Sequence, residues 1–452
     1  HKGKGQEALD FYEQMKSEGF SPDSVTFTCI LKACGRIGCI ENGEKIHHEI
    51  TSTGLLEEDF MLGTPLADMY AKCGMLQEAQ HVVDQLSIKT VTCWNALIAG
   101  YAQNDQGQEA ITCFGRMRSE GFSPDAVTFT CILKACGSIG AIDKGKQIHD
   151  EILTRGLLEK NVMLGSALVD MYAKCGVLTR AQQVLEDLPL RNVVSWNALI
   201  SGYAKHGGFH EALDCFDQMQ SEGVSPDTVT FICILKACGK IGDYMDKGRQ
   251  IHDDIVSRGL LQMDITVGTA LVDMYIKCGA LSKAHEVLKD LPIRDVVSWS
   301  ALISGYAQQG LGHEALKCFE QMQSEGLSPN VVTLICTLKA CGSIGAIEKG
   351  KQIHEDIVGR CLLEKDTVIG NALVDMYVKC GALTKAQEVL EDLPLRTMVG
   401  WSALISGYVQ IGQCHEALDC FEKMQSEGVC LDVVTFICVL KACGDIGAVD
   451  KG

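Results

Sequence analysis

Apolar residues recur along the chain with helical spacing, in short segments separated by glycines. One copy of this pattern reads "WNALISGYAKHGGFHEALDCFDQMQSEG" and begins at Trp196. Its first half places apolar residues at i, i+3, i+4 and i+7, namely Trp196, Leu199, Ile200 and Tyr203. The polar "HGG" interrupts the pattern, which then resumes until Gly223, a glycine in the position of a helix C-cap. The pattern predicts two helices joined by a tight turn.

The same hairpin pattern returns along the whole sequence in long units of about 102 residues, each divided into three hairpin types of about 35, 36 and 31 residues. The first type covers 91–125, 193–227, 296–330 and 398–432, with a truncated copy at 1–23. The second type covers 24–59, 126–161, 228–264 and 331–366, with a truncated copy at 433–452. The third type covers 60–90, 162–192, 265–295 and 367–397. Because both ends fall inside a hairpin, we expect the chain to be a segment of a longer array.

A hairpin of this length cannot bury its apolar face alone, so neighbouring hairpins must stack and share one continuous core. Only 8 prolines in 452 residues also favour long helical content over strands and turns. The sequence therefore predicts an all-α fold, a superhelical α-solenoid formed by one array of hairpins. Trp94, Trp196, Trp299 and Trp401 follow the apolar spacing, so we expect them in the core.

The composition excludes several classes of protein. The 23 cysteines lie inside helical phrases such as "LKACG" and "AKCG", which indicates buried free thiols in a reducing compartment. No run of eighteen apolar residues exists, so we expect no membrane partner. "HHE" at His47–Glu49 and "HDE" at His149–Glu151 match half of a zinc deaminase signature, but the P-C-x-x-C half is missing. We therefore expect packing histidines, with no metal site, no cofactor and no catalytic residues.

Three phrases carry a family resemblance: "VVSWNALISGYA…EALDCFDQMQSEGVSPD", "VTFICILKACG…KGRQIH" and "GNALVDMYVKCGALTKAQEVLEDLP". In their alternation the chain resembles the PLS class of pentatricopeptide repeat proteins, whose P, L and S repeats correspond to the first, second and third hairpin types. The resemblance implies a right-handed superhelix that binds single-stranded RNA in parallel orientation, with one nucleotide per repeat. It also implies that the fifth and last residues of a repeat select the base and that an apolar second residue packs against bases.

The chemistry of the last position can be reasoned independently. Uracil and guanine present a ring N–H donor on the Watson–Crick edge, whereas cytosine and adenine present a ring acceptor. A carboxylate only accepts hydrogen bonds, so Asp at this position favours U or G, and Asn, which can donate, favours C or A. At the fifth position the resemblance associates Asn with a pyrimidine and Ser or Thr with a purine.

These preferences give a predicted target for the twelve complete hairpins. U is predicted for Asn95 with Asp125 and for Asn197 with Asp227. A is predicted for Ser166 with Asn192 and for Ser300 with Asn330. G is predicted for Thr269 with Asp295 and for Ser402 with Asp432. A pyrimidine is predicted for Asn371 with Thr397, and a purine for Thr64 with Thr90.

The second hairpin type leaves its nucleotides open, because its fifth residues are Thr28, Thr130, Ile232 and Ile335 and isoleucine cannot hydrogen-bond a base. The predicted element is 5′-NRUNAUNGANYG-3′, with R a purine and Y a pyrimidine. The apolar second residues expected to pack against bases are Val194, Val297, Val368 and Val399.

The formal net charge of −18 opposes binding to a polyanion unless the positive charges gather in one place. Lysines of the second type follow the fifth residue by four positions and so share its helical face: Lys32, Lys134, Lys236 and Lys339. Lysines of the third type follow it by eight positions: Lys72, Lys174, Lys277 and Lys379. These eight predict a basic groove. Alternatively, the third-type lysines pair with aspartates four residues earlier, namely Asp68, Asp170, Asp273 and Asp375.

The favoured interpretation is an RNA-binding module that specifies sites of organellar C-to-U editing and is not itself an enzyme. The resemblance implies a plastid or mitochondrial location. It also implies small editing cofactors of the multiple-site organellar type, recruited through the second hairpin type. The competing interpretation is a protein-interaction solenoid, because related helical arrays bind peptides in the same groove. Variation at the repeat ends could also be surface drift.

Overall fold

The computed structural model describes residues 2–55, 61–159, 161–242 and 244–446, and in these residues all regular secondary structure is helical. The chain divides into two units, 1–234 and 235–452, and the boundary falls inside one helix, α15 (Thr228–Ile241). We describe each unit separately. None of the described helices is long and apolar enough to cross a membrane.

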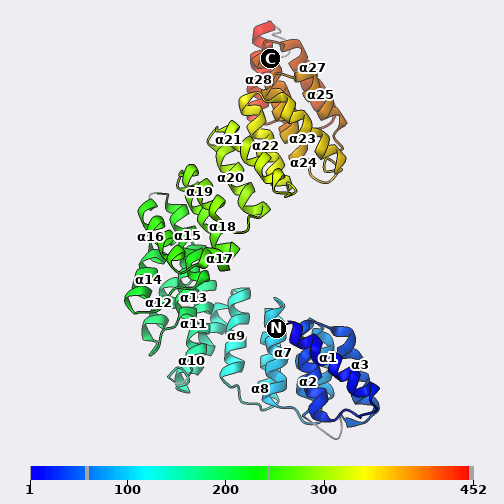
Figure 1. The fold of residues 1–452 in the computed structure, drawn as a ribbon, viewed down its shortest axis with the longest axis vertical. Helices are drawn as coiled ribbons and strands as arrows, with labels where there is room; N and C mark the ends of the chain where they lie inside the picture. Colours follow the sequence, from blue (N-terminus) through cyan, green and yellow to red (C-terminus); the bar gives the residue numbers. More distant parts are fainter. Residues whose placement is uncertain (1, 56–60, 160, 243, 447–452) are drawn as a thin grey trace. The chain divides into compact units, whose positions relative to one another are not determined.

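The first unit is a series of antiparallel helix pairs that begins with the single helix α1 (Lys2–Ser17) (Figure 1). The pairs are α2 (Ser24–Ile37) with α3 (Ile40–Ser52), α5 (Gly63–Lys72) with α6 (Leu76–Gln85), α7 (Val91–Gln103) with α8 (Gly107–Ser119), α9 (Ala126–Ile139) with α10 (Ile142–Thr154), α11 (Val162–Lys174) with α12 (Leu178–Asp187), and α13 (Val193–Lys205) with α14 (Phe209–Ser221).

The second unit repeats this arrangement. After α16 (Met245–Ser257) and the short α17 (Leu260–Met263), its pairs are α18 (Ile265–Lys277) with α19 (Leu281–Asp290), α20 (Val296–Gln308) with α21 (Gly312–Ser324), α22 (Val331–Ile344) with α23 (Ile347–Gly359), α24 (Thr367–Lys379) with α25 (Leu383–Asp392), and α26 (Met398–Gln410) with α27 (Cys414–Ser426), followed by α28 (Val433–Ile446). The hairpin pattern did not predict α17.

Polar caps and glycines explain where these helices begin and end. Asp125 precedes α9 and its side chain accepts a hydrogen bond from the backbone N–H of Thr128, which satisfies a donor that the helix leaves free. Gly223 follows α14 with a φ of 75°, a left-handed conformation that glycine adopts without a Cβ penalty. Its predicted place at the end of the second helix is therefore confirmed.

The core of each unit lies where the first helix of a hairpin contacts its own second helix and the first helices on either side. The four tryptophans are at most 1% exposed, which confirms their predicted core position. All 23 cysteines are free thiols, and most are buried or partly buried, whereas Cys29, Cys361 and Cys430 are exposed. Burial raises the pKa of the Cys136 thiol to about 12, so this side chain behaves as a small apolar residue. The predicted all-α array of stacked hairpins is confirmed within each unit.

Candidate nucleic-acid interface

The fifth residues of the hairpins lie on the first helices, and the last residues lie where the next first helix begins. Asn95 is on α7, and Asp125 is the N-cap of α9. Thr90, Asn192, Asp295 and Asn330 are also N-caps, and Thr397 stands at the N-cap position of α26 without a capping bond from its side chain. Asp227 and Asp432 act in the same way, because they accept hydrogen bonds from the backbone N–H groups of Thr230 and Thr435 at 2.9 and 2.7 Å.

This capping role was missed in the sequence interpretation. The signal was present, because Asp, Asn and Thr before an apolar run are typical N-caps. A capping residue uses one side-chain oxygen on the helix, so an aspartate retains a second oxygen for another donor.

In five hairpins the predicted pair of fifth and last residues is joined by a direct hydrogen bond. The bonded atoms are Asn95 Nδ2 and Asp125 Oδ1 (3.1 Å), Asn197 Nδ2 and Asp227 Oδ1 (2.9 Å), Ser166 Oγ and Asn192 Oδ1 (3.2 Å), Thr397 Oγ1 and Asn371 Oδ1 (2.8 Å), and Ser402 Oγ and Asp432 Oδ1 (3.0 Å). Residues about 26 to 30 positions apart in sequence are thus brought into single polar units.

The other three pairs are arranged differently. Ser300 reaches Asn330 through the hydroxyl of Thr333, at 2.5 and 2.9 Å. Thr64 and Thr90 both contact the Cys93 thiol, at 2.8 and 3.2 Å. Thr269 donates to the backbone carbonyl of Ile265 at 3.1 Å, while Asp295 caps α20.

The paired carboxylates are held in their ionised form. Burial disfavours the charge of Asp125, but hydrogen bonds from Thr128 and Asn95 outweigh it, so the pKa is lower than usual. The pKa of Asp227 is lowered by the equivalent bonds from Thr230 and Asn197, which again outweigh burial. The hydroxyl and the N–H of Thr435 lower the pKa of Asp432. At neutral pH these groups therefore act only as hydrogen-bond acceptors.

Apolar second residues stand out from the first helices into solvent. Val194, Val297, Val368 and Val399 are 50% to 60% exposed, which is unusual for valine in a helix with a buried face. The second hairpin type carries the same feature at Val127, Val229 and Val332, which the sequence interpretation did not include. Each of these valines begins the recurring phrase "VTF", or "VTL" in one copy, which could have indicated them.

Two cavities in the first unit show how these residues come together. One, of about 450 Å³, is lined by the fifth residues of three successive hairpins, Thr28, Thr64 and Asn95, together with Lys32, Thr90 and Val127. The other, of about 440 Å³, is lined by Thr130, Ser166 and Asn197 with Lys134, Val194 and Asp227. Base-reading candidates, a lysine and an exposed valine thus share one recess, although they lie far apart in the sequence.

The two sets of lysines differ in their charge environment. Lys32, Lys134, Lys236 and Lys339 are exposed, and within the described residues none of them makes an ion pair. The third-type lysines pair with the aspartates four residues earlier, at 2.5 Å for Lys72, 2.7 Å for Lys174, 2.5 Å for Lys277 and 2.7 Å for Lys379. The expected stripe of eight lysines is therefore partly neutralised, and four of its members are free of ion pairs.

The histidines pack as expected. His47, His149, His252 and His354 each hydrogen-bond through Nδ1 to the hydroxyl of a tyrosine in the following hairpin, at 2.9 to 3.0 Å. Burial lowers the pKa of all four, so the neutral imidazole is favoured. In the described part of the chain, no three metal-binding side chains cluster.

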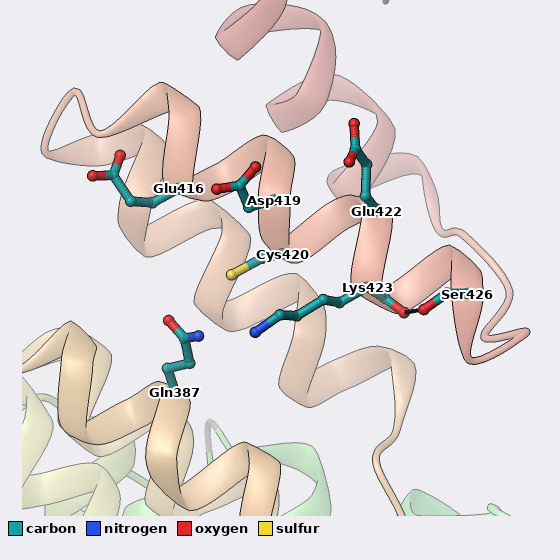
Figure 2. A pocket seen from close by; sticks show the side chains of 7 residues that line it. All are labelled: Gln387, Glu416, Asp419, Cys420, Glu422, Lys423 and Ser426. Atoms are coloured by element: carbon teal, nitrogen blue, oxygen red, sulfur yellow. Dashed lines mark hydrogen bonds between the residues drawn. The ribbon is translucent and has the colours of Figure 1, made fainter.

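A cavity of about 590 Å³ lies elsewhere, between the second helices α25 and α27. Figure 2 shows Glu416, Asp419 and Glu422 along α27, with Cys420 and Lys423 between α27 and Gln387. Lys423 pairs with Glu391 at 2.9 Å, and burial raises the pKa of the Cys420 thiol to about 11. The raised pKa favours the protonated thiol of Cys420, and three carboxylates of α27 line the cavity.

Comparison with known families identifies the repeats. A model described as PPR repeat family matches residues 1–36, 89–138, 191–240, 294–343 and 396–445, more than half of the chain. A second model, described as PPR repeat, matches 25–55, 127–157 and 371–396.

Several proteins of Arabidopsis thaliana are similar to this chain over almost its whole length. One pentatricopeptide repeat-containing protein is 36% identical over 95% of this chain, which spans 62% of that protein. A mitochondrial one is 34% identical over 99% of this chain, which spans 64% of it. A chloroplastic one is 36% identical over 98% of this chain, which spans 54% of it.

Solved structures show the same fold at lower identity. The pentatricopeptide repeat protein PPR10 from maize has a TM-score of 0.54 at 19% identity, covering 98% of this chain and 76% of that one. PPR10 in complex with an 18-nt psaJ RNA element has a TM-score of 0.62 at 20% identity, covering 98% and 69%. With the family models and the Arabidopsis relatives, these matches show that the chain belongs to the pentatricopeptide repeat family.

Proposed function

We propose that the protein binds single-stranded RNA sequence-specifically along its row of first helices, with one nucleotide read by each hairpin. The observation that carries this proposal is the set of polar side chains paired within hairpins of the first and third types, beside exposed apolar second residues. Each pair presents donors and acceptors, and each exposed second residue offers an apolar contact for the face of a base. A similar fold in complex with an RNA element supports the proposal.

The proposed repeat types are P, L and S for the first, second and third hairpin types, with the boundaries given above. The proposed target of the twelve complete hairpins is 5′-NRUNAUNGANYG-3′. Asn95 with Asp125 and Asn197 with Asp227 read U, because an ionised carboxylate accepts from the N3–H of uracil. Lysines of the second hairpin type contact phosphates, since they are exposed and free of ion pairs in the described residues.

The wider role we propose is to specify sites of C-to-U editing in plastid or mitochondrial transcripts, as in PLS-class proteins. Mitochondrial and chloroplastic relatives support an organellar location. The array itself acts by binding, and the reaction belongs to a separate deaminase activity.

A protein partner is a second candidate, supported by the outer helices of the second hairpin type. Leu153, Val256 and Val358 occupy one position on α10, α16 and α23, and each is at least 50% exposed. Recurring exposed aliphatic side chains fit contacts with a small editing cofactor. Replacing Leu153 with Ser should then weaken cofactor binding without changing RNA affinity.

The direct test exchanges one acceptor for a donor. Fluorescence anisotropy would compare RNAs with G or A at the eighth nucleotide, using wild type and Asp295→Asn. Asparagine caps helices as well as aspartate does, so folding should be preserved. The wild type should prefer G and the variant A, each by about tenfold, as expected for exchanging favourable and unfavourable hydrogen bonds. Equal binding of both RNAs by both proteins would refute base reading and favour the protein scaffold.

A further inference from the structure

A third side chain completes the polar pair in every first-type hairpin. It is the third residue of the hairpin that follows, and it is a threonine in each case: Thr128, Thr230, Thr333 and Thr435. All four are 0% exposed. A buried hydroxyl requires hydrogen-bond partners, and these threonines find them in the fifth and last residues of the preceding hairpin.

The hydroxyl of Thr230 and the carboxylate of Asp227 together hold the Asn197 amide in one orientation. It accepts from the backbone N–H of Asp227 at 3.1 Å, and its one proton lies toward Asn197 Oδ1 at 2.6 Å and Asp227 Oδ1 at 3.0 Å. The threonine engages the amide oxygen, and Nδ2 donates to the Asp227 carboxylate at 2.9 Å, so both partners favour the same orientation of the amide. Thr128 holds Asn95 in the same way, also at 2.6 Å from Oδ1.

In the described residues, three of the four third-type hairpins lack this arrangement, whereas in the hairpin that holds Thr64 the Cys93 thiol contacts both Thr64 and Thr90, at 2.8 and 3.2 Å. Ser298, which occupies the corresponding position, donates to the backbone carbonyl of Asp295 at 2.9 Å and accepts from its N–H at 3.2 Å. The fifth residue of that hairpin, Thr269, donates instead to Ile265. Ser298 therefore shares the capping role of Thr230 and lacks its contact with a fifth residue in the described structure.

We propose that the threonine after each first-type hairpin is a positioning residue for base specificity. The base is then selected by three residues, namely the fifth residue, the last residue and this threonine, rather than by two. This inference rests on the proposed RNA binding. With Oδ1 held by the threonine, Asn197 presents an N–H to the base, which suits the carbonyl oxygens beside N3–H of uracil. An amide turned by 180° would present an acceptor, which suits the amino group of cytosine. The threonine thereby favours U over C.

The test measures the ratio of affinities for RNAs with U or C at the sixth nucleotide, which the hairpin 193–227 is proposed to read. Thr230→Val removes the hydroxyl while keeping the side-chain shape, and we expect the U-over-C ratio to fall about three- to tenfold, the worth of one net hydrogen bond. Thr230→Ser retains the hydroxyl and should restore the ratio. Thr230→Ala removes the hydroxyl without adding a methyl group beside the amide, and replaces the valine variant if circular dichroism shows that it does not fold.

Ser298→Ala is the matched control, because it removes the same cap hydroxyl without touching a fifth residue. It should leave the G-over-A ratio at the eighth nucleotide unchanged. An unchanged U-over-C ratio in folded Thr230→Val or Thr230→Ala would overturn the inference alone, as would an equal loss of selectivity in Ser298→Ala. If the wild type shows no preference at the sixth nucleotide, the proposed base reading itself fails. Failure of the threonine inference alone leaves that wild-type preference intact, so the two outcomes can be distinguished.

Discussion

Aspartates such as Asp125 serve two purposes at once. The carboxylate caps α9 through Thr128 and receives the amide of Asn95 at 3.1 and 3.2 Å. Helix capping and the bond from Asn95 place the same requirement on the side chain, because both favour an ionised acceptor in a fixed position. A residue that caps a helix is held at the N-terminus of that helix, so the backbone fixes the position of the atom proposed to read the base.

The capping carboxylate should make stability depend on pH. The pKa of Asp125 is lower in the folded protein than the value of about 3.9 in an unfolded chain, so the folded state binds fewer protons. Its contribution to stability is complete above the unfolded pKa and is lost as the pH falls through the folded pKa. Urea unfolding from pH 7 to pH 2.5 should show Asp125→Asn less stable than wild type at neutral pH, with the difference shrinking below about pH 4.

Asp143→Asn is the control for this titration, because the Asp143 side chain is 91% exposed and lies 3.8 Å from Lys146. It should change stability little at any pH. A constant deficit for Asp125→Asn at pH 2.5 and pH 7 would contradict the proposed role of its charge.

At the scale of the helix, close approach depends on glycines in the first helices. A Cβ added at Gly100 on α7 would lie 2.7 Å from the Cβ of Ala71 on α5 and 3.0 Å from Leu76. Gly202 approaches Ala173 in the same way, at 2.7 Å. These contacts let first helices lie close enough for the side chains of neighbouring hairpins to share one cavity.

Two glycine substitutions should therefore have opposite effects on stability. Gly100→Ala forces overlap in a packed interface and should lower stability by about 1–3 kcal/mol. Gly115→Ala, on the exposed side of α8 with nothing within 4 Å of the added Cβ, should raise it by about 0.5–1 kcal/mol, because alanine is the better helix former. Denaturant unfolding measures both. Equal effects of the two variants would show that packing at α7 tolerates a methyl group.

At the scale of the whole molecule, the proposed RNA binding must overcome a net charge of −18. The lysines of the second hairpin type, which make no ion pairs in the described residues, provide positive charge near the fifth residues. The charge of the third-type lysines is partly neutralised by the aspartates with which they pair. Exposed i,i+4 ion pairs stabilise a helix only by about 0.3–0.5 kcal/mol, so a phosphate can compete for the lysine.

The salt dependence of RNA affinity should separate these roles. Lys134→Gln should reduce the slope of log affinity against log salt by about 0.7, the value for one lost phosphate contact on a single strand. Asp170→Asn should strengthen binding and steepen the slope, because it releases Lys174 from its pair at 2.7 Å. Lys385→Gln should change neither quantity, since Lys385 lies on α25 and pairs with Glu388. If the three variants gave the same slope of log affinity against log salt, the phosphates would not contact Lys134 or Lys174.

Much of the fold could be predicted from the sequence. Periodic apolar residues determine which faces of the helices are buried, and the recurrence of whole phrases determines that hairpins stack. Both are local properties, since a hairpin with one apolar face has few ways to bury it. The core position of Trp196 and the free thiols follow from the same pattern.

The candidate site depended on tertiary structure. Sequence spacing indicated which residues vary, including Asn197 and Asp227, but not that they meet at 2.9 Å. The sequence also did not show that the buried Thr230 orients the Asn197 amide. A hydroxyl three residues after a helix N-cap looks the same in the sequence in both situations. It can serve the cap alone, as at Ser298, or also contact the preceding hairpin, as at Thr230. The sequence likewise left open whether Lys174 contributes free charge to the groove or pairs with Asp170. Helix periodicity thus determines burial, whereas contacts across hairpins decide which polar atoms remain available to a ligand.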